Sequence, residues 1–509
     1  MTTPVRFTPS ALLARNATLS LLAYGWIFVV LIIAMPKLVC YLGEASFGLF
    51  SLAWIAIGYL GFLDIGVNRA ATKFVAEQVA RQDRQGAGEI LQTAVLVNLC
   101  MGMSGGLAVA AVTPYLVHSI FKISPELQGE GQMAFYAVAA AIPVLLVQGI
   151  FRAVLSSLQM FGWINSVEGL GTTAQWGVAC FLAWRGSGPG VVVWSSVAVR
   201  VGVAGVYTCL LWPLFPALHC WRTAHLHRLS GLLRFGGWVS VSQIANPLLL
   251  YADRFLIASW VSLSAVTLYT VPFEAMSRLR ILPSSLMAAL YPAFSERGIE
   301  SQSGQLQRLY QRSLHYLLMV LVPGGLFLCV LGPDLFGLWM GKTFAQQTTA
   351  VVRILALGVL ANALAPLPYD LLQALGHPNL TGKFHLLEVP LQFTLCVLFI
   401  PRWGLNGAAL ACTLRLALDS VLLFWAASRY CGCSLGDSGR YAKVLTPSVG
   451  LAFTLLVINA VSKTPIARLA AGVIAVASCL LASWYFAIDR EEKPRITGVF
   501  KTLLGESVS

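Results

Sequence analysis

Fourteen apolar stretches, each long enough to cross a bilayer as a helix, constrain this chain more than any motif does. A transmembrane helix needs about 20 predominantly apolar residues. Backbone polar groups must be satisfied internally in lipid, so such stretches become helices. We therefore expect an all-α integral membrane protein with about 14 transmembrane helices. The stretches lie at 18–40, 46–66, 90–115, 132–151, 164–184, 190–213, 237–260, 264–293, 314–331, 351–374, 384–400, 405–428, 445–461 and 467–487.

The composition agrees with this prediction. Of the 509 residues, 57% are hydrophobic and only 11% are charged, whereas an ordinary soluble domain carries roughly 25% charged residues. Such a chain has too few charges to cover the surface of a soluble protein. The composition therefore excludes a conventional soluble enzyme, a disordered chain and a secreted disulfide scaffold.

The positive charge of the chain is distributed unevenly between the two sides of the predicted helices. There are 34 Lys and Arg against 21 Asp and Glu, which gives a net charge of +13. An excess of this kind in a soluble protein would suggest nucleic acid. Here 21 of the 34 cations lie on the side that holds both termini and 7 on the other. By the positive-inside rule both termini are cytoplasmic, and no nucleic-acid partner is expected.

A weak internal repeat divides the chain. Leu158–Gly162 resembles Leu372–Gly376, 214 residues later, and Val197–Val201 resembles Cys412–Leu416, 215 residues later. Further matches with offsets of 216 to 219 pair Glu44–Phe50 with Leu263–Tyr269, Gln175 with Gln392 and Cys180 with Cys396. The repeat predicts an N-terminal lobe of helices 1–6, a C-terminal lobe of helices 7–12 and an added helix pair. The corresponding ranges are 1–213, 214–430 and 431–509.

Parallel repeats of this kind are typical of transporters, whose substrate sites lie near the midplane between the repeats. Six arginines fall inside the predicted spans, where charge is expensive and usually functional. They are Arg200, Arg254, Arg278, Arg280, Arg353 and Arg415. We interpret them as the lining of a cationic central cavity, because the planar guanidinium binds diphosphate or an anionic glycan bidentately. Salt bridges to nearby acids are the alternative, and Arg353 can also snorkel to an interface.

Four acidic residues in or beside the spans are candidates for ion coupling or gating: Asp64, Asp253, Glu274 and Asp419. Glu274 and Asp419 stand four residues from an intramembrane arginine, on the same helix face, so pairing within the helix is an alternative role. For Asp64 the alternative is an interaction at the end of its helix.

Motifs for other chemistries are missing from the sequence. It contains no P-loop, HExxH or CxxC pair, so we expect no metal site, no cofactor and no enzymatic activity. The glycines at 102, 105 and 106 predict close helix packing rather than a nucleotide loop.

Several segments resemble one known family. They are Leu42–Phe50, Gly58–Gly66, Phe74–Glu77, Tyr251–Ile257, Tyr291–Ser295 and Gln373–Gly376. In order and helix count the chain resembles the Wzx-type polysaccharide flippases, the oligosaccharide-flippase branch of the MOP superfamily. The resemblance covers essentially the whole chain.

This resemblance implies a MATE-like fold of two six-helix lobes plus helices 13 and 14. It implies translocation of an undecaprenyl-diphosphate-linked oligosaccharide across the bacterial inner membrane by alternating access. The partners it implies are this lipid-linked substrate, membrane lipids, H⁺ or Na⁺ as coupling ion, and glycan-assembly proteins. One alternative is a MATE-type small-molecule exporter, whose cationic substrates would favour an acidic cavity. The other is a membrane polysaccharide polymerase, which would need catalytic residues near a large outer loop.

Overall fold

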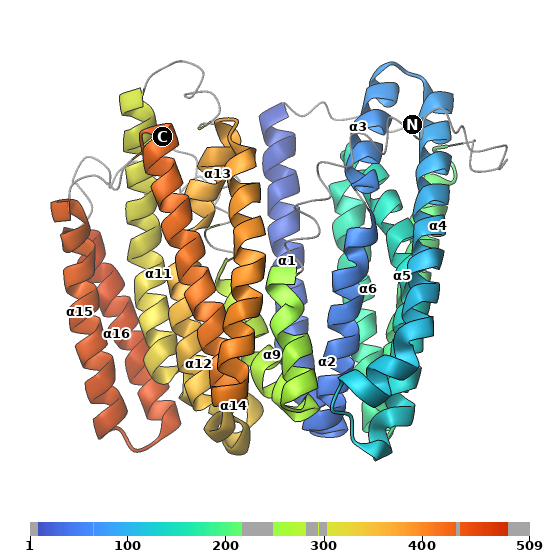
Figure 1. The fold of residues 1–509 in the computed structure, drawn as a ribbon. Coiled ribbons are helices and arrows are strands. Elements are labelled where there is room, and N and C mark those ends of the chain that lie inside the picture. Colours follow the sequence, from blue (N-terminus) through green and yellow to red (C-terminus); the bar gives the residue numbers. More distant parts are fainter. Residues whose placement is uncertain are drawn as a thin grey trace. The chain divides into compact units, whose positions relative to one another are not determined.

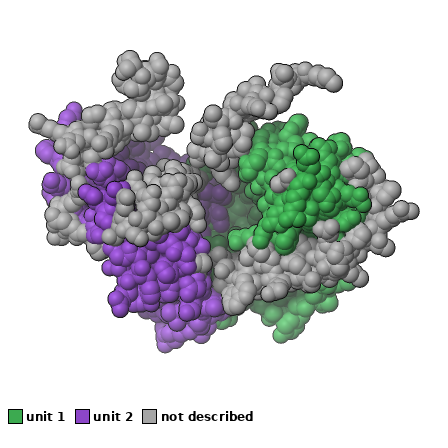
Figure 2. All heavy atoms as spheres, turned by 90° about the horizontal axis from the view of Figure 1, so that it is seen from above, with its two compact units in different colours: residues 1–270 green, residues 271–509 purple. Residues whose placement is uncertain are grey.

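The computed structural model describes residues 9–64, 66–215, 248–280, 283, 294, 303–433 and 438–486. Within these ranges the chain is helical and contains no strand (Figure 1). The chain divides into two compact units, Met1–Thr270 and Val271–Ser509 (Figure 2). This division follows packing, whereas the boundary at 213/214 concerns duplicated sequence and stays a prediction.

The first unit contains seven long or medium helices that the structure describes from end to end. They are α1 (Pro9–Leu42), α2 (Glu44–Tyr59), α3 (Val67–Ala80), α4 (Arg84–Tyr115), α5 (Gln128–Ser157), α6 (Phe161–Trp184) and α7 (Pro189–Leu211). Short helical turns follow α2 and α4: η1 (Leu60–Asp64), η2 (Leu116–Ile120) and η3 (Pro125–Leu127). Residues 248–260 are also helical, and α9 (Leu263–Ser277) begins in this unit.

The second unit begins within α9 and continues with η5 (Arg278–Arg280). Its helices are then α11 (Ser303–Met340), α12 (Lys342–Asn362), α13 (Pro366–Ala374), α14 (Pro378–Cys431), α15 (Ser438–Val461) and α16 (Pro465–Phe486). The start of the predicted span 237–260 and the end of 264–293 lie outside the described residues.

Nine helical stretches in the described part of the chain are long and apolar enough to cross a membrane. The prediction of an all-α, multi-pass membrane protein is thereby confirmed, and the count of 14 spans stays a prediction. The outer faces of α15 and α16 support this reading, since Phe453, Val461, Ile474 and Phe486 are each more than half exposed. Apolar patches of this kind are rare on soluble monomers and suit contact with lipid.

One helix of the second unit contains two predicted spans. The stretch α14 is helical on both sides of Gly404, but Gly404 itself has φ 54° and ψ −128°, which is not helical. Only glycine adopts such a conformation at little cost. The predicted spans 384–400 and 405–428 are the two arms of α14 on either side of this glycine.

Close packing of α4 on α5 depends on glycine. A Cβ atom built on Gly102 would lie 2.4 Å from the Cα of Pro143, and one on Gly106 would lie 2.6 Å from the carbonyl oxygen of Ala139. No side chain fits at such distances, so the two backbones are in contact. The prediction that these glycines serve helix packing is confirmed, and α5 is thereby fixed between α4 and the neighbouring α7.

Candidate functional site

A buried polar cluster lies inside the first unit, where α5, α6 and α7 meet. Arg200 of α7 pairs with Glu168 of α6, with 3.3 Å between Nη1 and Oε2. The other oxygen of Glu168 accepts hydrogen bonds from the hydroxyl of Tyr207 at 3.2 Å and, more weakly, from the amide of Gln148 at 3.4 Å. The Arg200 guanidinium also lies 5.7 Å from the centre of the Trp54 ring. Both charged side chains are less than one fifth exposed, so the pair is largely removed from solvent.

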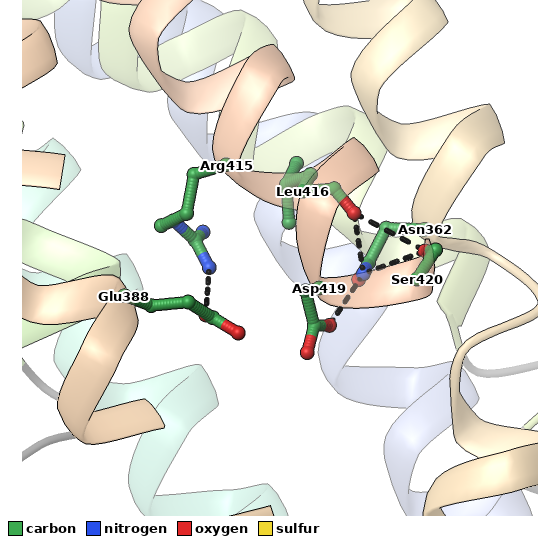
Figure 3. Close-up of polar contacts among 6 residues, drawn as sticks. All are labelled: Asn362, Glu388, Arg415, Leu416, Asp419 and Ser420. Carbon is green, nitrogen blue, oxygen red and sulfur yellow. Dashed lines mark hydrogen bonds and ion pairs between the residues drawn. The ribbon is translucent and has the colours of Figure 1, made fainter. Parts of the chain in front are cut away.

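A second cluster lies within α14 of the second unit. Arg415 pairs with Glu388 across 3.3 Å, and their side chains are 6% and 1% exposed. Glu388 stands on the arm before Gly404 and Arg415 on the arm after it. Figure 3 shows the arginine reaching across to the carboxylate.

Asn362, the last residue of α12, joins the second cluster to a neighbouring helix. Its amide nitrogen lies 2.7 Å from the Asp419 carboxylate, 3.2 Å from the carbonyl oxygen of Leu416 and 3.3 Å from the hydroxyl of Ser420 (Figure 3). Ser420 in turn donates to the carbonyl oxygen of Ala361. The end of α12 is thereby bound to one face of α14.

The two clusters follow the same plan. In each, an amide side chain, a glutamate and an arginine come from successive predicted spans. The arginines are 215 residues apart, the glutamates 220, and Gln148 and Asn362 are 214 apart. These offsets match or adjoin those of the sequence repeat. The clusters differ in charge at the position four residues after the arginine, which is Asp419 in the second unit and Ala204 in the first.

The predicted pair Asp253 and Arg254 is enclosed in the first unit. The side chain of Arg254 is fully buried, and its Nη1 lies 3.5 Å from Asp253 Oδ1. It also donates to the carbonyl oxygen of Leu250 and lies over the rings of Tyr251 and Tyr269. The Tyr269 hydroxyl donates to Asp253. Arg254 therefore has no exposed surface with which to touch a substrate.

The arginines that follow are more accessible. Arg278 pairs with Glu274 one helical turn earlier at 3.8 Å, and its side chain is 39% exposed. Arg353 is exposed on α12. The backbone of Arg280 lies in η5, but its side chain lies outside the described residues.

Asp64 lies at the end of η1 and is buried. Its Oδ1 accepts from the backbone N–H of Asn68 in the first turn of α3 and from the side chain of Asn98. Asn98 also donates to the carbonyl oxygen of Leu146 on α5. Asp64 thus satisfies a helix N-terminus, which would otherwise leave N–H groups without partners, and ties α3, α4 and α5 together.

Glu168, Glu388, Gln148 and Asn362 belong to the clusters, but the sequence prediction did not include them among the site residues. A signal for the two glutamates exists: a carboxylate within an apolar span is as costly as an arginine there. No comparable signal marks Gln148 or Asn362, since uncharged amides in membrane helices are often only packing contacts.

Two family models match the chain. One, described as "Polysaccharide biosynthesis protein", matches residues 13–297, which is more than half of the sequence. The other, "Lipid II flippase MurJ", matches residues 237–476.

Similar proteins come from bacteria and archaea. The chain is 24% identical over 430 residues to a protein of Shigella flexneri named "Putative O-antigen transporter", covering 82% of the chain and 98% of that protein. It is 23% identical to "Probable flippase AglR" of Haloferax volcanii, covering 75% of the chain and 76% of that protein.

Solved structures share the fold. The lipid II flippase MurJ in an inward closed conformation superposes with a TM-score of 0.73 at 12% identity, covering 92% of the chain and 99% of MurJ. An inward-facing multidrug-resistance MATE transporter of the MOP superfamily gives a TM-score of 0.65 at 14% identity, covering 82% and 98%. The predicted MATE-like architecture is confirmed.

Proposed function

Because the chain belongs to the polysaccharide biosynthesis protein family, we propose that it translocates an undecaprenyl-diphosphate-linked oligosaccharide across the bacterial inner membrane. Its matched relatives are named as an O-antigen transporter and a flippase, and its fold is that of a lipid II flippase. In this proposal the protein is a transporter and not an enzyme. Both termini are cytoplasmic, as the positive-inside distribution of the loops indicates.

The observation that carries the proposal is the pair of buried ionic clusters, one in each unit. A protein that only fills a membrane gains nothing from charge inside apolar helices, whereas transporters concentrate such charge along substrate and ion pathways. Transporters built from repeats move by alternating access, in which one repeat or bundle rocks against the other. Two units with matching polar interiors fit that mechanism.

Exposure separates the predicted arginines into two roles. Arg254 and Arg415 are enclosed and already bound to Asp253 and Glu388, so we assign them to structure and to the ionic clusters. Arg278 has a longer, partly exposed contact with its acid. Its guanidinium can exchange Glu274 for a diphosphate, with which it forms two parallel hydrogen bonds. We assign Arg278 as a diphosphate contact of the cationic cavity.

The test is glycan export in a bacterial strain from which the gene for this chain has been deleted. Arg278→Ala should lower the amount of surface glycan about tenfold to a hundredfold, as expected for the loss of a charge-assisted hydrogen bond. Arg278→Lys should give an intermediate amount, because lysine keeps the charge and loses the fork.

Arg308→Ala is the matched control, since Arg308 is exposed on α11 and donates to the carbonyl oxygen of Gly304 in its own helix. Membrane levels of each variant are measured alongside export. Normal export by Arg278→Ala would remove the assigned diphosphate contact. Normal surface glycan in the deletion strain itself would remove the proposed function.

A further inference from the structure

The two ionic clusters differ in their charge balance. In the first unit Glu168 faces Arg200, which makes a neutral pair. In the second unit Glu388 and Asp419 share one arginine, Arg415, so the fully ionised cluster carries an extra negative charge. A buried charge without a partner is strongly unfavourable and takes up a cation or a proton.

Two carboxyl oxygen atoms make up the unsatisfied part of the second cluster. Oε1 of Glu388 and Oδ1 of Asp419 are both buried and have no hydrogen-bond partner among the described residues. The two carboxyl groups interact electrostatically with each other, and Figure 3 shows both turned toward the space between the arms of α14. The Glu388 side chain is 1% exposed, so its free oxygen is shielded from bulk solvent.

A proton accounts for both oxygens at once. A protonated carboxyl group is a donor and an ionised one is an acceptor, so one proton held by either residue supplies a bond for the other. Metal ions that prefer oxygen need several ligands, about six to eight for Ca²⁺. Among the described residues no three metal-ligating side chains gather in one place. The arrangement suits a proton better than a metal cation.

The remaining polar groups around the pair are few. Among the described residues, Arg415 is the charged side chain that faces Glu388, and His385, also on α14, interacts with Asp419. From α12 the contact is Asn362, an amide that does not titrate. From α13 the ring of Tyr369 stacks on His385 at 6.2 Å. Only Arg415 among these carries a permanent positive charge.

We propose that Glu388 and Asp419 form a proton-binding pair, and that this proton is the coupling ion of the transporter. The coupling role of the proton rests on the proposed function, whereas the binding of the proton does not. With the proton bound, the cluster is neutral like that of the first unit. Without it, the two neighbouring carboxylates are both negatively charged, and Arg415 balances only one of these charges.

Infrared difference spectroscopy tests the binding directly. The purified full-length protein in liposomes is compared between acidic and alkaline buffer, and the C=O stretching band of a protonated carboxyl group is followed. We expect one such band to titrate in the wild type and to disappear in both Glu388→Gln and Asp419→Asn. In each variant one carboxylate remains opposite Arg415, so the charge is balanced without a proton. Glu126→Gln is the control, because Glu126 is exposed in η3, and it should keep the band.

The other outcomes are equally decisive. A band that is unchanged in both variants, or one that Na⁺ removes at constant pH, would overturn the proton assignment. If Asp419→Asn does not fold, Asp419→Ala replaces it, since alanine stands at the equivalent position 204. Surface glycan export by the wild-type protein is measured in parallel. If the protein exports glycan but shows no titrating carboxyl band, only this inference is overturned. If it shows the band but exports no glycan, only the proposed function is overturned.

Discussion

Glu388 and Arg415 are 27 residues apart in one helical stretch, yet their side chains meet at 3.3 Å. A straight α-helix would separate them by about 40 Å. They meet because the chain reverses at Gly404, so that the two arms of α14 lie against each other. The ion pair and the glycine are thus two parts of one arrangement.

Replacement of Gly404 should therefore disturb the Glu388–Arg415 ion pair, although Gly404 is adjacent to neither residue of the pair in the sequence. Gly404→Ala forces a side chain into a backbone conformation reserved for glycine, at a cost of about 1–3 kcal/mol. We expect a lower midpoint of thermal unfolding for the purified protein. Gly432→Asn is the control, because Gly432 has φ 64° and ψ 12° at the end of α14 and asparagine tolerates that left-handed conformation. An equal loss in both variants would argue against a special role for Gly404.

Glu168→Ala should destabilise the first unit. The substitution leaves the partly buried Arg200 without its carboxylate. Removing one partner of a buried ion pair costs about 3–5 kcal/mol of unfolding free energy. The loss should be smaller here because this pair is partly exposed. Thermal unfolding in detergent measures the loss. The double variant Glu168→Ala, Arg200→Ala should recover part of the stability, because no unpaired charge remains. A double variant as unstable as the single one would contradict this reading.

Arg254→Ala should reduce the amount of folded protein in the membrane and not selectively reduce export. The change removes the partner of buried Asp253, with an expected loss of about 3–5 kcal/mol. Size-exclusion chromatography of a fluorescent fusion gives the folded fraction. Arg402→Ala is the control, since Arg402 is exposed and donates to the carbonyl oxygen of Leu398 in its own helix. Full membrane levels combined with lost export would instead make Arg254 a functional residue.

Two glycine substitutions should have opposite effects on stability, one at the contact between α4 and α5 and one at an open position. Gly102→Ala places a methyl group against the backbone of Pro143 and should cost about 1–3 kcal/mol through overpacking. Gly177→Ala on α6 meets no atom within 4 Å and should stabilise by about 0.5–1 kcal/mol, because alanine is the better helix former. Unfolding midpoints that move in the same direction for both would refute the packing argument.

The sequence predicted the all-α, multi-pass architecture because apolar length is a property of the chain itself. It also located both arginines of the ionic clusters, since charge in an apolar stretch is conspicuous. The partners were harder to predict: Arg200 has no acid within one turn of its own helix, and its partner Glu168 lies 32 residues away. For Arg415 the nearest acid in sequence is Asp419, but the ion pair is formed with Glu388. Pairing between helices depends on how they pack, which sequence spacing within one helix does not reveal.

Exposure was likewise not predictable from the spans. Arg254 and Arg278 both stand near acids in apolar stretches, but one side chain is fully buried and the other is 39% exposed. The difference arises from Tyr251 and Tyr269, whose rings cover Arg254. The sequence provided six candidate arginines, and the packing distinguishes buried Arg254 from partly exposed Arg278.

The positions Ala204 and Asp419 show how the two similar halves of a protein can come to differ in charge. Alanine codons that end in a pyrimidine differ from an aspartate codon by a single nucleotide, so one point mutation can add or remove a carboxyl group at this place. A chain with two similar halves can in this way carry an ionisable group at this position in one half and not in the other. A difference in charge between the two halves then needs no new domain, only the methyl side chain of an alanine replaced by the carboxymethyl side chain of an aspartate.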